Sequence, residues 1–250
     1  IQAHWRGYST RRNISNKLLL NIQKKIKNAN SDEYHSLISR TNRAVDILLN
    51  SLNITKILTA LKTLDTCTKL SSICCIRLEQ SGGLSRLISL LISSNRSVPH
   101  KEIVTFCFSI LLNLAKYDKT VNSVWEEEAM LETTVSLMKI WAKDSNIFNK
   151  CCCLLYIFCQ DQNRAQVLKS ISEFTYQVET LYKDVARKQK CVSQNTKIPR
   201  KSTINFHTRE SKQIDPEWLL GNHRKRTFED PLTAISSLMH SLGLKPNQDK

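Results

Sequence analysis

The chain has 250 residues, of which 41% are hydrophobic and 24% are charged, and its formal net charge is +15. This composition is that of a folded globular protein and excludes a chain that is disordered throughout. No apolar run reaches the roughly 18 residues of a membrane-spanning helix, so we expect no membrane partner.

The positive charge lies at the two ends of the chain. Residues 1–30 hold seven Lys or Arg and no acid, residues 31–187 hold eighteen against sixteen, and residues 188–250 hold twelve against six. A nearly neutral middle argues against a nucleic-acid-binding groove and favours terminal segments that meet acidic surfaces. For the C-terminal part, solvation of an exposed segment explains the charge equally well.

The first 14 residues predict a basic amphipathic helix. Ile1, Trp5 and Tyr8 recur at helical spacing on one face, and arginines lie beside that face. Gly7 costs a helix about 1 kcal/mol relative to Ala, which indicates that another chain approaches closely there. The alternative is an amphipathic helix that packs on its own domain.

The same segment resembles the IQ motif, a helix that binds calmodulin. The motif has an apolar residue followed by Gln, a basic residue followed by Gly, a second basic residue and a final apolar residue, and every position is matched here. The resemblance implies that calmodulin or a calmodulin-like light chain binds this helix in its calcium-poor form, with Ile1 in the cleft of one lobe. The predicted calmodulin-binding residues are Ile1, Gln2, Trp5, Arg6, Gly7, Arg11, Arg12 and Ile14.

The predicted helix continues beyond the motif. Leu18, Ile22 and Ile26 extend the apolar stripe, and lysines cluster near its end, as the helix dipole favours. The polar residues 28–32 predict a break, so we assign residues 1–30 to an IQ-motif helix.

Residues 31–187 predict a body made of helices. Segments 57–70, 103–117 and 149–160 share an apolar helical pattern followed by a short polar turn, and segments 84–92, 131–141 and 174–182 follow them at equivalent places. The period of about 45 residues is typical of HEAT and armadillo arrays. We therefore predict an all-α fold, an armadillo/HEAT-like helical repeat superhelix preceded by a long IQ helix; the alternative is an irregular helical bundle.

Two short segments of the sequence resemble parts of an armadillo repeat in particular. Gly82 and Gly83 resemble the glycine pair that turns the chain sharply into the second helix, and residues 111–115 resemble the end of the third helix. One such hairpin cannot bury its own apolar face, so stacked neighbours must share a continuous core.

Residues 188–250 predict a basic linker and tail with one short helix. Asp230 and Pro231 fit the N-cap and first position of a helix over about 231–242, and Gly243 fits its end. We expect this helix to dock on the repeats, although an external partner would also satisfy its apolar stripe.

Nothing in the sequence predicts catalysis, a metal site or a cofactor. The consecutive residues Cys151, Cys152 and Cys153 diverge by about 100° each on a helix, so they cannot share a metal ion, and no His lies near them. Nine cysteines instead favour a reducing compartment, cytosol or nucleus, where Cys serves as a small apolar residue. Since nucleotide-binding and hydrolase motifs are also absent, we predict a non-enzyme.

The order of these modules, with the tail segments 215–220 and 231–235, resembles the C-terminal region of the abnormal spindle, or microcephaly-associated, family. The resemblance implies a non-catalytic calmodulin-binding scaffold whose repeats bind spindle-pole or microtubule-associated proteins. It places the protein in the cytoplasm, at the spindle pole and, in interphase, in the nucleus. The alternative is direct binding of microtubules or another polyanion by the basic ends.

Overall fold

The computed structural model describes residue 7 and residues 17–25, 27–28, 36–127, 129–195, 228 and 230–244. All regular structure in these ranges is helical, which confirms the all-α prediction. The helices of the body are α2 (Leu37–Asn50), α3 (Ile54–Leu70), α4 (Ser72–Gln80), α5 (Gly83–Ile92), α6 (Val98–Ala115), α7 (Asp118–Glu126), α8 (Met130–Ile140), α9 (Ser145–Phe158), α10 (Gln162–Ser170), α11 (Ser172–Asn195) and α13 (Pro231–Ser241). No described helix is both long and apolar enough to cross a membrane.

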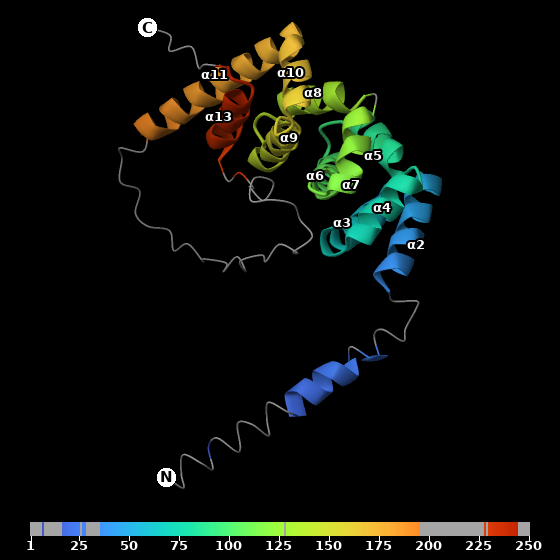
Figure 1. The fold of residues 1–250 in the computed structure, drawn as a ribbon. Helices are drawn as coiled ribbons and strands as arrows, with labels where there is room; N and C mark the ends of the chain where they lie inside the picture. Colours follow the sequence, from blue (N-terminus) through green and yellow to red (C-terminus); the bar gives the residue numbers. More distant parts are fainter. Residues whose placement is uncertain are drawn as a thin grey trace.

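The helices form a stack of three-helix units. After the pair α2 and α3, the units are α4–α5–α6, α7–α8–α9 and α10–α11–α13. The last helix of each unit packs on the last helix of the next, so α3, α6, α9 and α13 form one continuous row. Figure 1 shows this row running through the curved body. The predicted helical repeat is therefore present.

The repeat differs from the sequence prediction in one respect. The equivalent segments picked out from the sequence are α3, α6 and α9 and, as a second set, α5, α8 and α11. The short helices α4, α7 and α10 lie between these sets, where the sequence had suggested only short turns. They are nine residues each, and such short helices are hard to recognise because they span only two to three helical turns.

Asn, Asp and Ser side chains set several helix starts. The Asn53 carboxamide oxygen accepts hydrogen bonds from the backbone N–H groups of Thr55 and Lys56, at 2.9 and 3.2 Å. The Asp161 carboxylate accepts from Asn163 and Arg164 in the same way, at 2.9 and 3.1 Å. Such caps satisfy backbone donors that the first helical turn leaves without partners.

The glycine pair between α4 and α5 turns the chain as predicted. Gly82 has a φ of 74°, in the left-handed region that favours glycine. Gly83 has an ordinary φ, but a Cβ added there would lie 2.3 Å from Leu78 Cδ1 and 2.9 Å from the Leu78 carbonyl oxygen. One glycine is needed for backbone conformation and the other for close packing.

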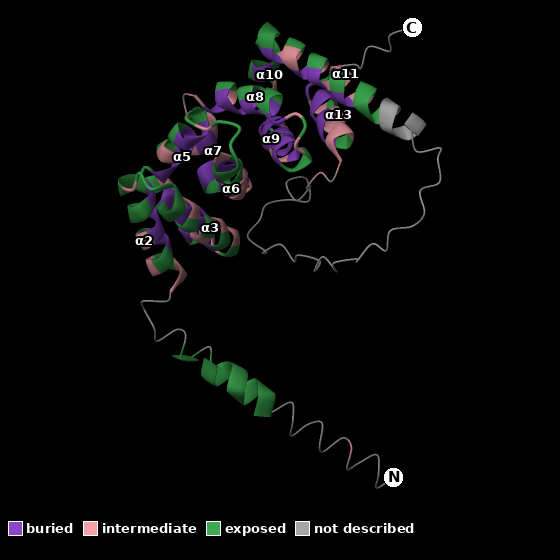
Figure 2. Cartoon of the chain, turned by 180° about the vertical axis from the view of Figure 1, so that it is seen from behind, coloured by how far each residue is buried: buried purple, intermediate pink, exposed green. Residues whose placement is uncertain are grey.

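The core runs without a break from α2 to α13. Figure 2 shows buried residues along the stacked helices of the body. The eight cysteines whose side chains the structure describes are all buried and form no disulfide. Burial raises the pKa of the Cys75 thiol to about 12 and that of Cys159 to about 11. These thiols therefore act as small apolar core residues, as predicted.

The C-terminal helix completes the last unit of the stack. The Asp230 carboxylate caps α13 by accepting the Thr233 backbone N–H at 3.0 Å, and Gly243 ends the helix with a φ of 64°. Helix α13 packs on α9 and α11. Its buried apolar residues are Ala234, Ile235, Leu238 and Met239, followed by Leu242. The expectation that this helix docks on the repeats is confirmed.

One predicted boundary was wrong. The sequence placed the start of a linker at Lys188, but α11 continues to Asn195. Polar and basic residues there lack an apolar stripe, yet they contain no Pro or Gly, so nothing prevents the preceding helix from continuing.

Candidate functional site

The predicted calmodulin-binding segment lies mostly outside the described residues. Of the eight predicted residues, only Gly7 is described, and it is helical and half-buried. Ile1, Gln2, Trp5, Arg6, Arg11, Arg12 and Ile14 lie outside the described residues, so their roles stay predictions.

The helix immediately beyond the motif is described and is exposed. Residues 17–25 and 27–28 are helical, and every one of them is exposed. Leu18, Leu19, Leu20 and Ile22 have exposed fractions of 57, 55, 64 and 51%. Figures 1 and 2 show this helix apart from the repeats. This part of the chain is therefore not packed on the repeats, and the alternative of an IQ helix packed on its own domain concerns residues outside the described ranges.

The helix that carries the exposed leucines also carries positive charge. Lys17, Lys24, Lys25 and Lys27 lie on the same helical segment, and residues 1–30 contain no Asp or Glu. Apolar side chains left in water on a basic helix gain free energy when an acidic partner with apolar clefts covers them. The segment therefore has the properties of a binding helix.

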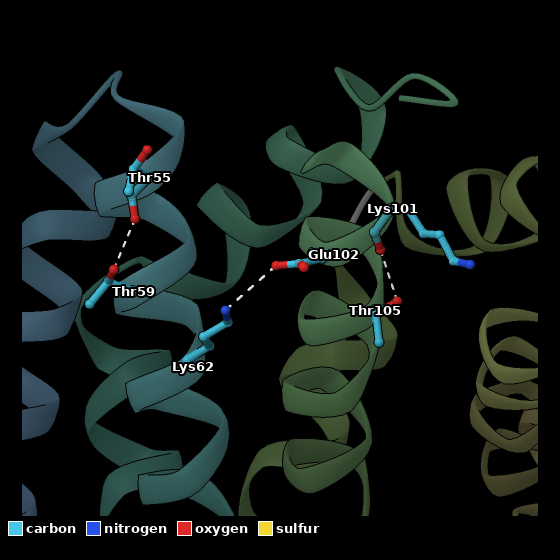
Figure 3. Close-up of polar contacts among 6 residues, drawn as sticks. All are labelled: Thr55, Thr59, Lys62, Lys101, Glu102 and Thr105. Atoms are coloured by element: carbon cyan, nitrogen blue, oxygen red, sulfur yellow. Dashed lines mark hydrogen bonds and ion pairs between the residues drawn. The ribbon is translucent and has the colours of Figure 1, made fainter. Parts of the chain in front are cut away.

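A second candidate surface is the row formed by α3, α6 and α9. Polar side chains connect each helix of this row to the next. Lys62 on α3 pairs with Glu102 on α6, with 3.5 Å between Nζ and Oε2, as Figure 3 shows. The same ammonium lies 5.7 Å from the centre of the Phe106 ring. Further along, Lys101 pairs with Asp144 at 2.6 Å and so joins α6 to the N-cap of α9.

The deepest of these contacts centres on Lys150. Its ammonium donates to the Ser109 hydroxyl at 2.7 Å and to the Thr105 carbonyl at 3.0 Å. Burial lowers the pKa of Lys150, and the nearby Asp65 carboxylate opposes this shift. Burial likewise raises the pKa of Asp65, while Lys150 lowers it.

Asn113 adds a contact between α3 and α6 at the same place. Its amide donates to the Thr68 hydroxyl at 3.0 Å and to the Asp65 backbone carbonyl at 3.4 Å. The predicted helical segments contain Asn113, Lys150 and Asp65, but the sequence assigned none of them a contact, because a polar residue inside an apolar helix gives no sign of which neighbour it will meet. These residues hold successive units in register.

The described residues contain no cluster of His, Cys, Asp and Glu that could hold a metal ion. The eight cysteines whose side chains are described are buried. Burial raises the pKa of Cys153 to about 11, and that of Cys107 is raised further. A protonated, inaccessible thiol is a poor nucleophile.

Comparison with known proteins identifies the relatives of this chain. Abnormal spindle-like microcephaly-associated proteins from Homo sapiens and Macaca fascicularis are each 33% identical to it over 265 aligned residues, which include 98% of the chain. The homologue from Canis lupus familiaris is 32% identical over the same share. The chain is a homologue of these abnormal spindle proteins.

The match extends through the N-terminal helix and the repeats alike, so it confirms the family resemblance noted from the sequence. The chain spans about 8% of the length of these relatives. No protein-family model matches the chain, and no solved structure matches it.

Proposed function

We propose that this chain is a non-catalytic scaffold that binds calmodulin, or a calmodulin-like light chain, through its N-terminal helix and binds other proteins through armadillo-like repeats. The observation that carries the proposal is the set of exposed apolar residues, Leu18, Leu19, Leu20 and Ile22, on the basic helix that follows the IQ pattern. These apolar side chains lie in water directly after the segment that the sequence predicts to bind calmodulin.

The energetics support such a partner. Full burial of a Leu or Ile side chain contributes about 1.5–3 kcal/mol, and the four exposed apolar residues at positions 18–22 are each more than half exposed. The lysines around them would meet the carboxylates of an acidic protein. Calmodulin combines acidic charge with apolar clefts, so it suits this helix better than a purely charged surface does.

The proposed place of action is the spindle pole. The names of the relatives associate them with an abnormal spindle and with microcephaly. We infer a role in cell division for this chain, with spindle-pole or microtubule-associated proteins as partners of the repeats. The corresponding localisation is the cytoplasm and the spindle pole, with the nucleus in interphase.

A second candidate function is direct attachment of the basic ends to microtubules or another polyanion. The charge of residues 1–30, seven basic residues against no acid, favours it. The two functions differ in salt dependence. Polyanion binding should weaken steeply as salt rises, whereas a complex that also buries leucines should lose less affinity.

Calorimetric titration of the chain with calmodulin tests the proposal. The double substitution Ile1→Asp and Arg6→Glu should abolish binding, and Leu18→Asp with Ile22→Asp should weaken it. Leu52→Asp is the matched control, because Leu52 is 90% exposed but lies in the repeat body. Binding that is unaffected by either double substitution would refute the assignment.

A further inference from the structure

The outer side of the repeats carries a groove along α8. Three adjoining hollows with volumes of about 730, 360 and 270 Å³ share lining residues from this helix. Lys139 lines the first two hollows, Ile140 lines the first and third, and Glu132 lines the second and third. The hollows therefore form one continuous surface, bordered by α5 on one side and α11 on the other.

The largest hollow has an apolar and aromatic lining. It includes the buried side chains of Trp141 and Leu181, the partly exposed Ile140, and Tyr176, which is 70% exposed. The Trp141 Nε1 atom is buried and has no hydrogen-bond partner among the described residues. A buried donor without an acceptor costs about 1–3 kcal/mol.

Four cations surround this hollow, namely Arg96, Lys139, Lys143 and Lys188. All four are exposed, and none forms an ion pair within the described parts of the chain.

Two carboxylates also line the hollow, but each has a basic neighbour outside the lining. Asp144 pairs with Lys101 at 2.6 Å, and Asp184 lies 4.0 Å from Arg187. The hollow therefore presents positive charge around an apolar centre.

The other end of the groove has the opposite charge. Glu132 and Glu173 line the second hollow, and Glu132 also lines the third. A nucleic acid carries a negative charge on every nucleotide, so its backbone would be repelled at this end. A peptide can place carboxylates at one end only, and it fits the charge distribution of the whole groove better.

We propose that the groove along α8 binds an acidic peptide segment of a partner protein. A bulky apolar or aromatic side chain enters the hollow beside Tyr176 and Trp141, and flanking carboxylates pair with Lys139 and Lys143. The inference rests on the proposed scaffold function of the repeats and specifies the chemistry of their partner. It is independent of calmodulin binding by the N-terminal helix.

The test uses the whole chain and a defined probe. The probe is a fluorescein-labelled peptide of about a dozen residues, with Asp and Glu around one Trp in its first half and uncharged residues in its second half. A control peptide has Ser in place of Trp. Fluorescence anisotropy should show binding of the probe and weaker binding of the control peptide, because the apolar centre of the hollow is then left unfilled.

Substitutions locate the binding. Lys139→Glu with Lys143→Glu should lower the affinity for the probe about tenfold or more, since two favourable charge contacts become repulsive. Tyr176→Ala should lower it several-fold without changing the charge. The matched control, Lys56→Glu with Lys119→Glu, reverses two exposed lysines outside the groove and should have little effect. Circular dichroism checks that each variant is folded.

Three outcomes would overturn the proposal. They are no binding of the probe, an equal loss of affinity in the control pair, and tighter binding of a single-stranded oligonucleotide that depends on the same two lysines. Titration with calmodulin separates the two proposals. The Lys139→Glu and Lys143→Glu variant should bind calmodulin normally, and a chain that binds the probe but not calmodulin would refute only the N-terminal site.

Discussion

Replacing Leu238 by Ala tests whether the C-terminal helix is part of the repeat core. Leu238 is 0% exposed, and α13 packs on α9 and α11. Truncating a buried Leu to Ala costs about 2–5 kcal/mol, made up of lost apolar burial and the cavity left behind. Because α13 is the last helix of the stack, it can detach while the other units stay folded. The stability that the substitution can remove is therefore limited to the free energy that holds α13 against the other helices.

Urea unfolding followed by circular dichroism gives the global stability, and amide hydrogen exchange gives the local stability of α13. A loss of about 2–5 kcal/mol that is shared by the whole fold lowers the urea midpoint by roughly 1–2 M. If α13 detaches alone, exchange in α13 should instead accelerate while that in α6 is unchanged. The control Leu52→Ala, at a side chain that is 90% exposed, should change stability by less than about 0.5 kcal/mol. An unchanged midpoint together with unchanged exchange in α13 would refute the packing argument.

Three further predictions concern the repeat body. Gly83→Ala should destabilise the fold by more than Gly82→Ala. The new Cβ at position 83 would lie 2.9 Å from the Leu78 carbonyl oxygen, whereas a Cβ at position 82 would meet open space and only the unfavourable φ opposes it. Equal urea midpoints of the two variants would contradict this. Arg86→Ala should lower the free energy of unfolding by about 1–3 kcal/mol, since its guanidinium donates to two carbonyls at the end of α2, at 3.1 and 3.4 Å. An unchanged urea midpoint would show that these contacts contribute nothing. Burial raises the pKa of Cys75 from 9.0 to about 12, so its contribution to stability is complete below pH 9 and is lost as pH rises toward 12. If the free energy of unfolding of a Cys75→Ala variant fell as steeply above pH 9 as that of the unmodified chain, this reasoning would be refuted.

The helical repeat was predictable because each unit repeats the same apolar spacing. The α13 boundaries were predictable too, because Asp230, Pro231 and Gly243 each have one strong local preference. What the sequence did not reveal depends on contacts between units. Lys150 can be partly buried because Thr105 and Ser109 on a neighbouring helix accept its hydrogen bonds, and no local pattern contains that information.

The same reason explains why the sequence did not predict the groove along α8. Tyr176 on α11 and Lys139 on α8 lie in different units and meet at one hollow only after the units stack. The N-terminal site shows the opposite case. Its residues are contiguous, so a motif predicts it directly, and the exposed leucines at positions 18–20 are consistent with that prediction.

Size-exclusion chromatography of the 250-residue chain mixed with calmodulin, with calcium and with a calcium chelator, tests the central claim most directly. The account predicts that the two proteins elute together as one complex in the chelator-containing buffer. Separate elution in both buffers would contradict it, because the exposed basic helix would then have no calmodulin to cover it.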